Sequence, residues 1–245
     1  MTAHDEVHVW TVDLDPPGHD AQADATCLDD DERLRAARFV FDTDRRRFTV
    51  RRAALRQVLA ERMGREPVDV RYAVGRFGRP SVPGHALDFS LSHRGERALI
   101  AITGSGQPGQ PLGTRLGVDI ERVAMAHAEP GMLQRHVEAD ALATCSAALG
   151  NGDPCPFFRW WTVIEAVAKA RGTGLAEEPP AQAAAWWLDR PVELPDETGV
   201  IRRFTVHCWE PEAGFVAALA HSAPPQAVRI RGVLPALAQR REAIA

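Results

Sequence analysis

Residues 116–122 read LGVDIER, and this short stretch guides the interpretation of the rest of the chain. Its alternating pattern predicts a strand, on which successive side chains face opposite ways. Val118 and Ile120 then enter a core, while Asp119 and Glu121 project together from the other face. Two carboxylates at this spacing can share one hard cation such as Mg²⁺. An edge strand with a solvated acidic face gives the same pattern, so the strand alone leaves both interpretations open.

The next informative stretch, toward the C-terminus, is WWTVIEAVAK at residues 160–169. As a helix it places Trp161, Glu165 and Lys169 on one face at spacings of four residues. An exposed Glu–Lys pair of this kind is worth only a few tenths of a kcal/mol. Here, however, the pair contains the single lysine of the chain and follows the aromatic run at 157–161, which predicts a largely buried helix. A charged pair on such a helix needs a partner or a cleft. The other side of the helix is predicted to pack, through Trp160, Val163, Ile164 and Val167.

Two stretches before residue 116 carry groups suited to a phosphate. The sequence FGRP at 77–80 holds Arg79 in a rigid turn, which is a favourable way to fix a cation. The strand FSLSHR at 89–94 ends in Ser92 and His93. Adjacent side chains on a strand diverge, and no Gly-x-Ser-x-Gly elbow is present, so a serine hydrolase is not indicated. A surface turn and a polar hairpin end are the alternatives.

Arginines make one surface of the N-terminal part basic. Three stand in a run at 45–47, and five more lie at positions 33, 35, 38, 51 and 52. Most are expected to be solvated, and a few could hold a nucleotide phosphate or an acidic protein. Nucleic acid is not an expected partner, because no aromatic stacking platform interleaves with the cluster.

Composition indicates an ordinary globular protein. The chain has 45% apolar and 25% charged residues and a net charge of -4, with no general attraction to nucleic acid or to anionic membrane. Its four cysteines lack zinc-site spacing and suggest no disulfide framework. The first ten residues lack a signal-peptide pattern, and no apolar run reaches membrane-spanning length. We therefore expect a reduced cytoplasmic protein that is not associated with a membrane.

The remaining pattern predicts an α+β fold. A Gly/Pro-rich stretch at 103–114 predicts a flexible connection between halves at 1–110 and 111–245. Each half ends in paired β segments, which favours two pseudo-symmetric halves, each a small antiparallel sheet packed with helices. A helix opening at acids 29–32 has Leu34, Ala37, Phe39 and Phe41 available for burial. Strands are expected at 7–14, 70–74, 87–91, 98–102, 201–209 and 215–221, and further helices at 44–63, 131–149 and 157–171.

Taken in order, these stretches resemble the motifs of the surfactin-type (Sfp-type) 4'-phosphopantetheinyl transferase family. That family shows a G-K-P turn, an N-x-S-H-S strand end, a G-V-D-I-E strand, and a W-[ST]-x-K-E-[AS]-x-x-K helix followed by G-x-G-L. The matching stretches here lie at 78–80, 89–93, 117–121, 161–169 and 172–175. Four motifs in the right order and spacing are hard to obtain by chance, and the resemblance runs from about residue 33 to about residue 221.

The resemblance implies an activity and its residues. The enzyme would move the 4'-phosphopantetheine of coenzyme A to a serine of an apo acyl or peptidyl carrier protein, acting as a monomer with its site between the halves. Glu165 would act as base, with Lys169 as the catalytic cation. The implied Mg²⁺ ligands are Asp119, Glu121 and Glu165, and the implied coenzyme A contacts are Arg35, Arg47, Arg79, Pro80, Ser92, His93, Asp119 and Lys169.

Three departures from the family pattern stand out. Ile164 replaces the lysine that precedes the catalytic glutamate, Arg79 replaces a lysine, and the stretch 103–114 is longer than expected. The first departure alone favours a non-catalytic module that binds coenzyme A or a carrier protein. A magnesium-dependent phosphohydrolase is a third interpretation. None of the departures removes an implied metal ligand.

Overall fold

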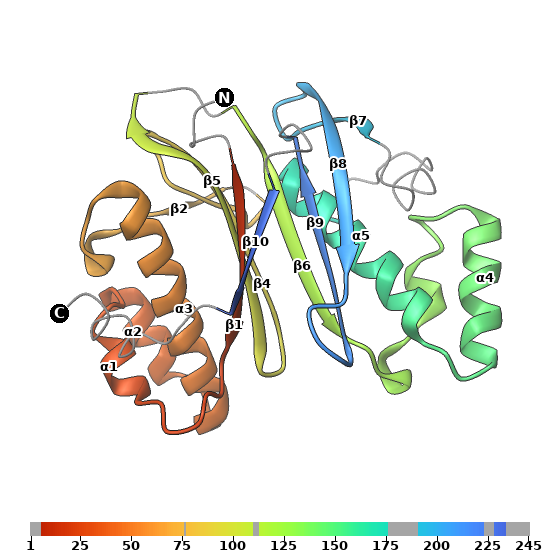
Figure 1. The fold of residues 1–245 in the computed structure, drawn as a ribbon, viewed down its shortest axis with the longest axis horizontal. Helices are drawn as coiled ribbons and strands as arrows, with labels where there is room; N and C mark the ends of the chain where they lie inside the picture. Colours follow the sequence, from red (N-terminus) through yellow and green to blue (C-terminus); the bar gives the residue numbers. More distant parts are fainter. Residues whose placement is uncertain (1–5, 76, 110–112, 176–190, 223–227, 234–245) are drawn as a thin grey trace.

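The computed structural model of the chain describes residues 6–75, 77–109, 113–175, 191–222 and 228–233. Two four-stranded sheets form its centre (Figure 1). Sheet 1 has the order β10 (Val228–Val233), β1 (Val7–Asp13), β5 (Arg97–Pro108) and β4 (His85–Arg94). Sheet 2 has the order β6 (Leu116–Arg122), β9 (Phe215–His221), β8 (Ile201–Trp209) and β7 (Val192–Pro195). Neighbours within the sheets are antiparallel except β1 and β10, and β2 (Ala73–Val74) pairs separately with β3 (Pro80–Ser81).

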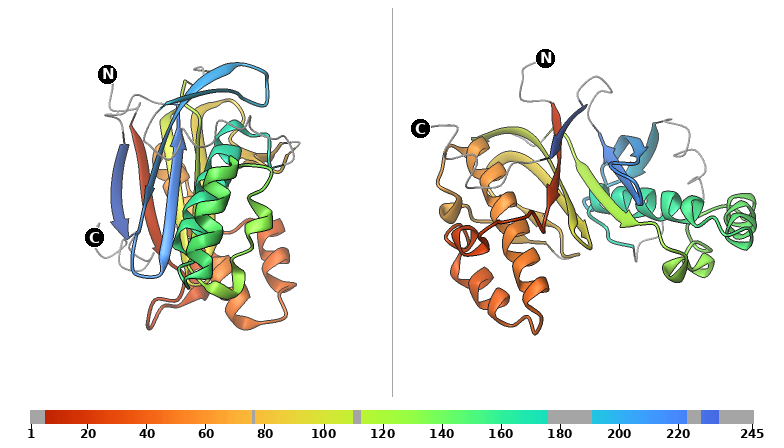
Figure 2. Two further views of the ribbon diagram at one scale, coloured as in Figure 1. Left: turned by 90° about the vertical axis from the view of Figure 1, so that its right-hand side faces the viewer. Right: turned by 60° about the horizontal axis from the view of Figure 1, so that its bottom comes forward.

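Helices cover the outer faces of the two sheets, as Figures 1 and 2 show. Sheet 1 is covered by α3 (Asp42–Met63), against which α1 (Ala21–Ala25) and α2 (Asp30–Ala37) pack. Sheet 2 is covered by α5 (Cys155–Arg171), with α4 (Ala139–Gly150) beyond it. The inner faces of the sheets pack on each other, with Val9 and Leu99 in one cluster with Val118 and Leu219. Short 3-10 turns complete the described elements at Pro67–Asp69, Met125–His127 and Pro130–Met132. The predicted α+β fold of two small helix-covered sheets is therefore confirmed.

The two long helices end where glycine allows it. Gly64 (φ 62°) follows α3 and Gly172 (φ 79°) follows α5, both in the left-handed conformation that most residues avoid. The Gly172 amide donates to the Ala168 carbonyl at 2.9 Å. The sequence predicted both stops. In the described residues no helix is long and apolar enough to cross a membrane.

Helix α2 begins where predicted but turns a different face inward. The side chain of Asp29 caps it by accepting from the Glu32 amide at 2.9 Å. The expectation that Leu34 and Phe41 would be buried is wrong, since they are 60% and 70% exposed. Of the other two, Ala37 is exposed and Phe39 is half-buried. Glu32 and Ala36 are buried instead, because the Glu32 carboxylate binds arginines of α3.

The expectation of a flexible connection at 103–114 is also wrong for residues 103–108, which belong to a strand. Strand β5 continues through Pro108, and β4 begins early enough to pair Leu87 with Gly104 and His85 with Pro108. The register shifts between these two pairs, as in a β-bulge. Strand β4 is longer than predicted, and its hydrogen bonds to β5 keep residues 103–108 in a strand despite their Gly/Pro-rich composition. Residues 110–112 lie outside the described part.

The last described strand belongs to the first sheet. β10 runs parallel to β1, with Val7 opposite Val228 and His8 opposite Arg229. A division of the chain at residues 110 and 111 therefore misplaces β10, because residues 228–233 complete the sheet of the first half. Nothing local in the sequence indicates which neighbour this strand takes.

Candidate functional site at the junction of the two sheets

Strands β4 and β6 are edges of their sheets, and they meet through side chains rather than through a backbone ladder. The Leu116 amide donates to Asp88 Oδ2 at 2.9 Å, and the Val118 amide donates to Ser90 Oγ at 3.1 Å. Ser92 continues the series by donating to Asp119 Oδ1 at 2.7 Å. These contacts satisfy an open strand edge and fix the two halves in register. Sequence reasoning missed the roles of residues 88 and 90, which their alternation with Ser92 on one strand face could have indicated.

Helix α5 crosses β6 at Gly117 with almost no space between them. A Cβ at this position would lie 2.2 Å from the Ala166 carbonyl oxygen and 2.4 Å from the Ala170 nitrogen. Only glycine permits this approach. The close crossing brings Glu165 and Lys169 of the helix next to Asp119 of the strand.

We expect Gly117→Ala to lower the free energy of unfolding by about 2 kcal/mol, because the added methyl group forces the helix away from the strand. Urea unfolding measures the change. Gly131→Ala is the matched control, since a Cβ there meets nothing within 4 Å. Equal stabilities of the two variants would contradict the proposed tight crossing.

Asp119 is the best-buried acid of the site, with 5% of its side chain exposed. Its Oδ1 accepts from Lys169 Nζ at 2.6 Å and from Ser92 Oγ at 2.7 Å. Its Oδ2 is buried and has no hydrogen-bond partner in the described part of the chain. A buried carboxylate oxygen without a partner is costly unless a ligand completes it.

Glu121 and Glu165 surround Asp119 with further negative charge. Burial, followed by the charge of Asp119, raises the pKa of Glu121 to about 7. Arg94, whose Nε lies 3.2 Å from Glu121 Oε2, opposes this rise only in part. The pKa of Glu165 is likewise raised, mainly by burial and against the attraction of Lys169, whose Nζ lies 4.0 Å from Glu165 Oε2. The predicted acids therefore influence one another electrostatically.

The chemistry of these acids fits a hard divalent cation. Two raised pKa values and one unpartnered buried oxygen mark an excess of negative charge that such a cation relieves. The described residues contain no group of three His, Cys, Asp or Glu side chains already gathered as metal ligands. The nearest cation to Asp119 is the Lys169 ammonium group. A shared ion therefore requires the side chains of Glu121 and Glu165 to turn toward Asp119.

We expect the metal-free protein to become less stable as the pH rises from 5 to 8. With a folded pKa of about 7 against an ordinary 4.5, Glu121 binds its proton more tightly in the folded state. This rise in the pKa of Glu121 corresponds to about 3 kcal/mol of folding free energy. That stabilisation is present at low pH and is lost as the pH rises through 7. Thermal unfolding with chelator at several pH values tests this. Glu121→Gln should flatten the profile, and an unchanged profile would contradict it.

A cavity of about 270 Å³ lies beside the acids, between the Arg79 turn and α5. Pro80, Glu165 and Lys169 line it, as does Arg79. The Arg79 Nη2 atom donates to both Asp88 oxygens at 2.6 Å and to the Leu116 carbonyl at 3.0 Å. Arg79 thus lines the cavity, and this end of its guanidinium joins the two halves.

The other predicted phosphate contacts are only partly brought together. His93 follows Ser92 near the end of β4, and burial, followed by repulsion from Arg51 and Lys169, lowers its pKa to about 4. Arg35 lies over the ring of Phe48, at 5.4 Å from the centroid. Arg47 Nε donates to Asp15 at 2.9 Å, and no described contact joins it to the acids.

Ile164, the main departure from the family pattern, is 1% exposed and belongs to the core of the second half. The predicted packing face of α5 is confirmed, since Trp160, Val163 and Val167 are buried with it. The isoleucine therefore points away from Glu165 and Lys169. The structure gives no reason to treat it as loss of a charge at the acids.

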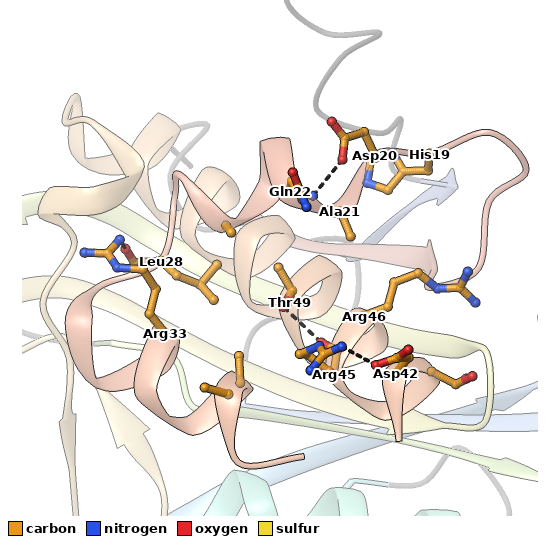
Figure 3. A pocket seen from close by; sticks show the side chains of 14 residues that line it. His19, Asp20, Ala21, Gln22, Leu28, Arg33, Asp42, Arg45, Arg46 and Thr49 are labelled. Atoms are coloured by element: carbon orange, nitrogen blue, oxygen red, sulfur yellow. Dashed lines mark hydrogen bonds and ion pairs between the residues drawn. The ribbon is translucent and has the colours of Figure 1, made fainter. Parts of the chain in front are cut away.

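A second cavity, of about 570 Å³, lies among α1, α2 and α3, far along the chain from the acids (Figure 3). Three arginines line it, and each forms an ion pair with a carboxylate. Arg33 pairs with Asp30 at 2.6 Å, Arg46 pairs with Asp15 at 2.7 Å, and Arg45 turns toward Asp42. The positive charges of these arginines are therefore already neutralised by carboxylates of the protein.

Both halves of the chain match families of known proteins. Residues 13–105 match the family described as "4'-phosphopantetheinyl transferase, N-terminal", and residues 115–220 match the "4'-phosphopantetheinyl transferase superfamily". The chain is 33% identical over 177 residues to "4'-phosphopantetheinyl transferase HetI" of Nostoc sp., which covers 71% of each protein.

Two eukaryotic relatives match over less of their length. The "L-aminoadipate-semialdehyde dehydrogenase-phosphopantetheinyl transferase" of Schizosaccharomyces pombe is 28% identical over 62% of each chain. The "Phosphopantetheinyl transferase" of Thraustochytrium sp. is 28% identical over 60% of this chain and 54% of its own length. In both, the match spans less than two thirds of the relative. Together with the two family matches, these findings show that the chain belongs to the 4'-phosphopantetheinyl transferase superfamily and is an enzyme of that class.

Proposed function

We propose that this enzyme transfers the 4'-phosphopantetheine of coenzyme A to a serine of an apo carrier protein, with Mg²⁺, as a surfactin-type transferase acting as a monomer. The observation that carries the proposal is the meeting of Ser92 from the first half with Asp119 and Lys169 from the second. Because this acid–lysine cluster lies next to a cavity in a member of the transferase superfamily, phosphoryl-group chemistry fits it best.

Asp119, Glu121 and Glu165 are the residues that would hold Mg²⁺, and the bound ion supplies charge neutralisation to the diphosphate of coenzyme A. Lys169 adds a positive charge directly beside Asp119, at 2.6 Å. This charge stabilises the phosphoryl oxygens as negative charge develops on them during transfer.

Glu165 serves as the general base in this proposal. Burial raises its pKa, which brings its basicity closer to that needed near neutral pH. It takes the proton of the carrier serine as the serine oxygen bonds to the β-phosphorus. The bond from that phosphorus to the bridging oxygen then breaks, and 3',5'-ADP leaves with that oxygen. Atoms and charge balance with no further reactant.

The other proposed contacts to coenzyme A are assigned from the positions of the residues around the cavity beside α5. Arg79 and Pro80 line the cavity beside α5, and Ser92 and His93 lie near the end of β4, the strand that borders it. Arg35 and Arg47 are proposed to extend this grip from the side of the first half, with the contacts given above as their resting partners.

Mass spectrometry of an apo carrier protein incubated with coenzyme A, Mg²⁺ and this enzyme tests the proposal. We expect a gain of one phosphopantetheinyl group and its loss when a chelator replaces Mg²⁺. No gain on several acyl and peptidyl carriers, with coenzyme A still bound, would support a binding module. Release of phosphate or ADP without any carrier would support a phosphohydrolase.

A further inference from the structure

Arg94 forms an ion pair with Glu121, one of the three acids proposed to hold Mg²⁺. The Arg94 Nε atom lies 3.2 Å from Glu121 Oε2. Of the arginine side chain 41% is exposed, against 18% of the glutamate side chain. An ion pair with so exposed a partner is weak and opens readily. Glu121 thus has a cationic partner from the protein itself, and this partner can be replaced.

The seam between β4 and β6 explains why these two residues meet. Asp88, Ser90 and Ser92, every second residue of β4, each contact β6. Arg94 is the next residue of that series, and it lies against Glu121. The contacts that fix the two halves in register therefore also place a guanidinium group beside a proposed metal ligand.

The neighbouring arginines at this end of the seam bind carboxylates outside the proposed metal site. Arg97 Nη1 lies 2.9 Å from Asp13 Oδ1 on β1. Arg122, the last residue of β6, pairs with Glu96 of the turn between β4 and β5. Of these three arginines, Arg94 is the one that binds an acid of the proposed site.

The ion pair and a bound metal ion make opposite demands on Glu121. Mg²⁺ binds carboxylate oxygens at about 2.1 Å, so an ion shared with Asp119 requires the Glu121 carboxylate to turn toward that residue. This turn moves the carboxylate away from Arg94 and opens the ion pair. The guanidinium charge also repels an approaching cation. Both effects oppose metal binding.

We propose that Arg94 is a positioning residue that competes with Mg²⁺ for Glu121 and thereby sets the Mg²⁺ concentration at which the site fills. This inference rests on the proposed function. When the ion binds, Glu121 leaves the guanidinium group and joins Asp119 and Glu165 as a ligand. Removal of Arg94 therefore tightens metal binding. A residue that oriented Glu121 for the metal would instead weaken metal binding when removed.

The test measures binding of Mn²⁺, which takes the same oxygen ligands as Mg²⁺, in the absence of coenzyme A and carrier protein. Electron paramagnetic resonance of the free ion gives the affinity, and displacement of Mn²⁺ by Mg²⁺ gives that of Mg²⁺. We expect Arg94→Gln to bind both ions about 5-fold to 20-fold more tightly. Arg94→Lys should fall between this variant and the unaltered enzyme, because it keeps the charge and loses the planar fork.

Arg122→Gln is the matched control. It removes the same charge one residue after Glu121, and the Arg122 side chain is 45% exposed, but its partner is Glu96. We expect its Mn²⁺ affinity to change by less than about twofold, because exposed charges without a direct contact are screened. Melting temperatures with chelator check the fold of each variant. The rise in melting temperature at a fixed Mg²⁺ concentration measures binding independently.

A double-variant cycle tests whether Arg94 acts through Glu121. Glu121→Gln removes the carboxylate for which the arginine and the metal compete. In that background, Arg94→Gln should change the Mn²⁺ affinity no more than Arg122→Gln does. An equally large gain in affinity there would overturn the competition, because Arg94 would then act on the ion by charge alone.

Two further results would overturn the inference. One is equal Mn²⁺ affinity in Arg94→Gln and Arg122→Gln, and the other is weaker Mn²⁺ binding in Arg94→Gln than in the unaltered enzyme. Failure of the unaltered enzyme to bind Mn²⁺ or Mg²⁺, or to transfer phosphopantetheine, is a different result and overturns the proposed function itself.

Discussion

Glu165→Gln is expected to lower kcat by at least about 10³-fold, because it removes both a proposed base and a proposed metal ligand. The glutamine amide is nearly the same size, so the fold should persist. Burial and the charge of Asp119 both raise the pKa of Glu165, which means that its ionised form is disfavoured in the free protein. The neutral variant should therefore melt at the same temperature as the unaltered enzyme or slightly higher.

Rates of carrier modification, followed by mass spectrometry, measure this effect. Glu129→Gln is the matched control, since Glu129 is exposed and precedes a short turn away from the acids. Glu165→Gln should lower the affinity for coenzyme A by a far smaller factor than it lowers kcat. Full activity in this variant would remove Glu165 as base and as ligand.

Lys169→Ala is expected to lower kcat by about 10²-fold, because the lost ammonium group is the nearest positive charge to Asp119. Arg46→Ala also removes one positive charge, but Arg46 is exposed and pairs with Asp15 near the surface. Such a pair contributes roughly 1 kcal/mol or less, and its loss should leave transfer nearly unchanged.

Parallel kinetics of the two variants distinguish a local from a general charge effect. At saturating coenzyme A, the Lys169 variant should show the loss in kcat rather than only in KM, if the ammonium acts mainly in the transition state. Equal losses in both variants would mean that net charge, and not the position of Lys169, determines the rate.

The elements that carry the site could be predicted because their patterns are local. The register of residues 116–122 follows from strand alternation, and the face that presents Glu165 and Lys169 follows from helical spacing. Both hold without knowledge of any distant partner. The site residues themselves stay predictions until the variants are measured.

What the sequence did not reveal depends on distant partners. Helix α2 turns Glu32 inward because Arg56, 24 residues later, is fully buried and needs a carboxylate. Arg79 joins Asp88 and Leu116, and neither pairing is visible in the turn itself.

The position of β10 has a consequence for biosynthesis. Because β10 pairs with β1, sheet 1 is the later of the two described four-stranded sheets to be completed as the chain is made. Until residues 228–233 leave the ribosome, β1 presents an open edge to other chains. A contact that spans 221 positions, from Val7 to Val228, also slows folding relative to neighbouring pairings. Newly synthesised chains therefore depend on β10, the last strand of the described residues, to protect this edge from aggregation.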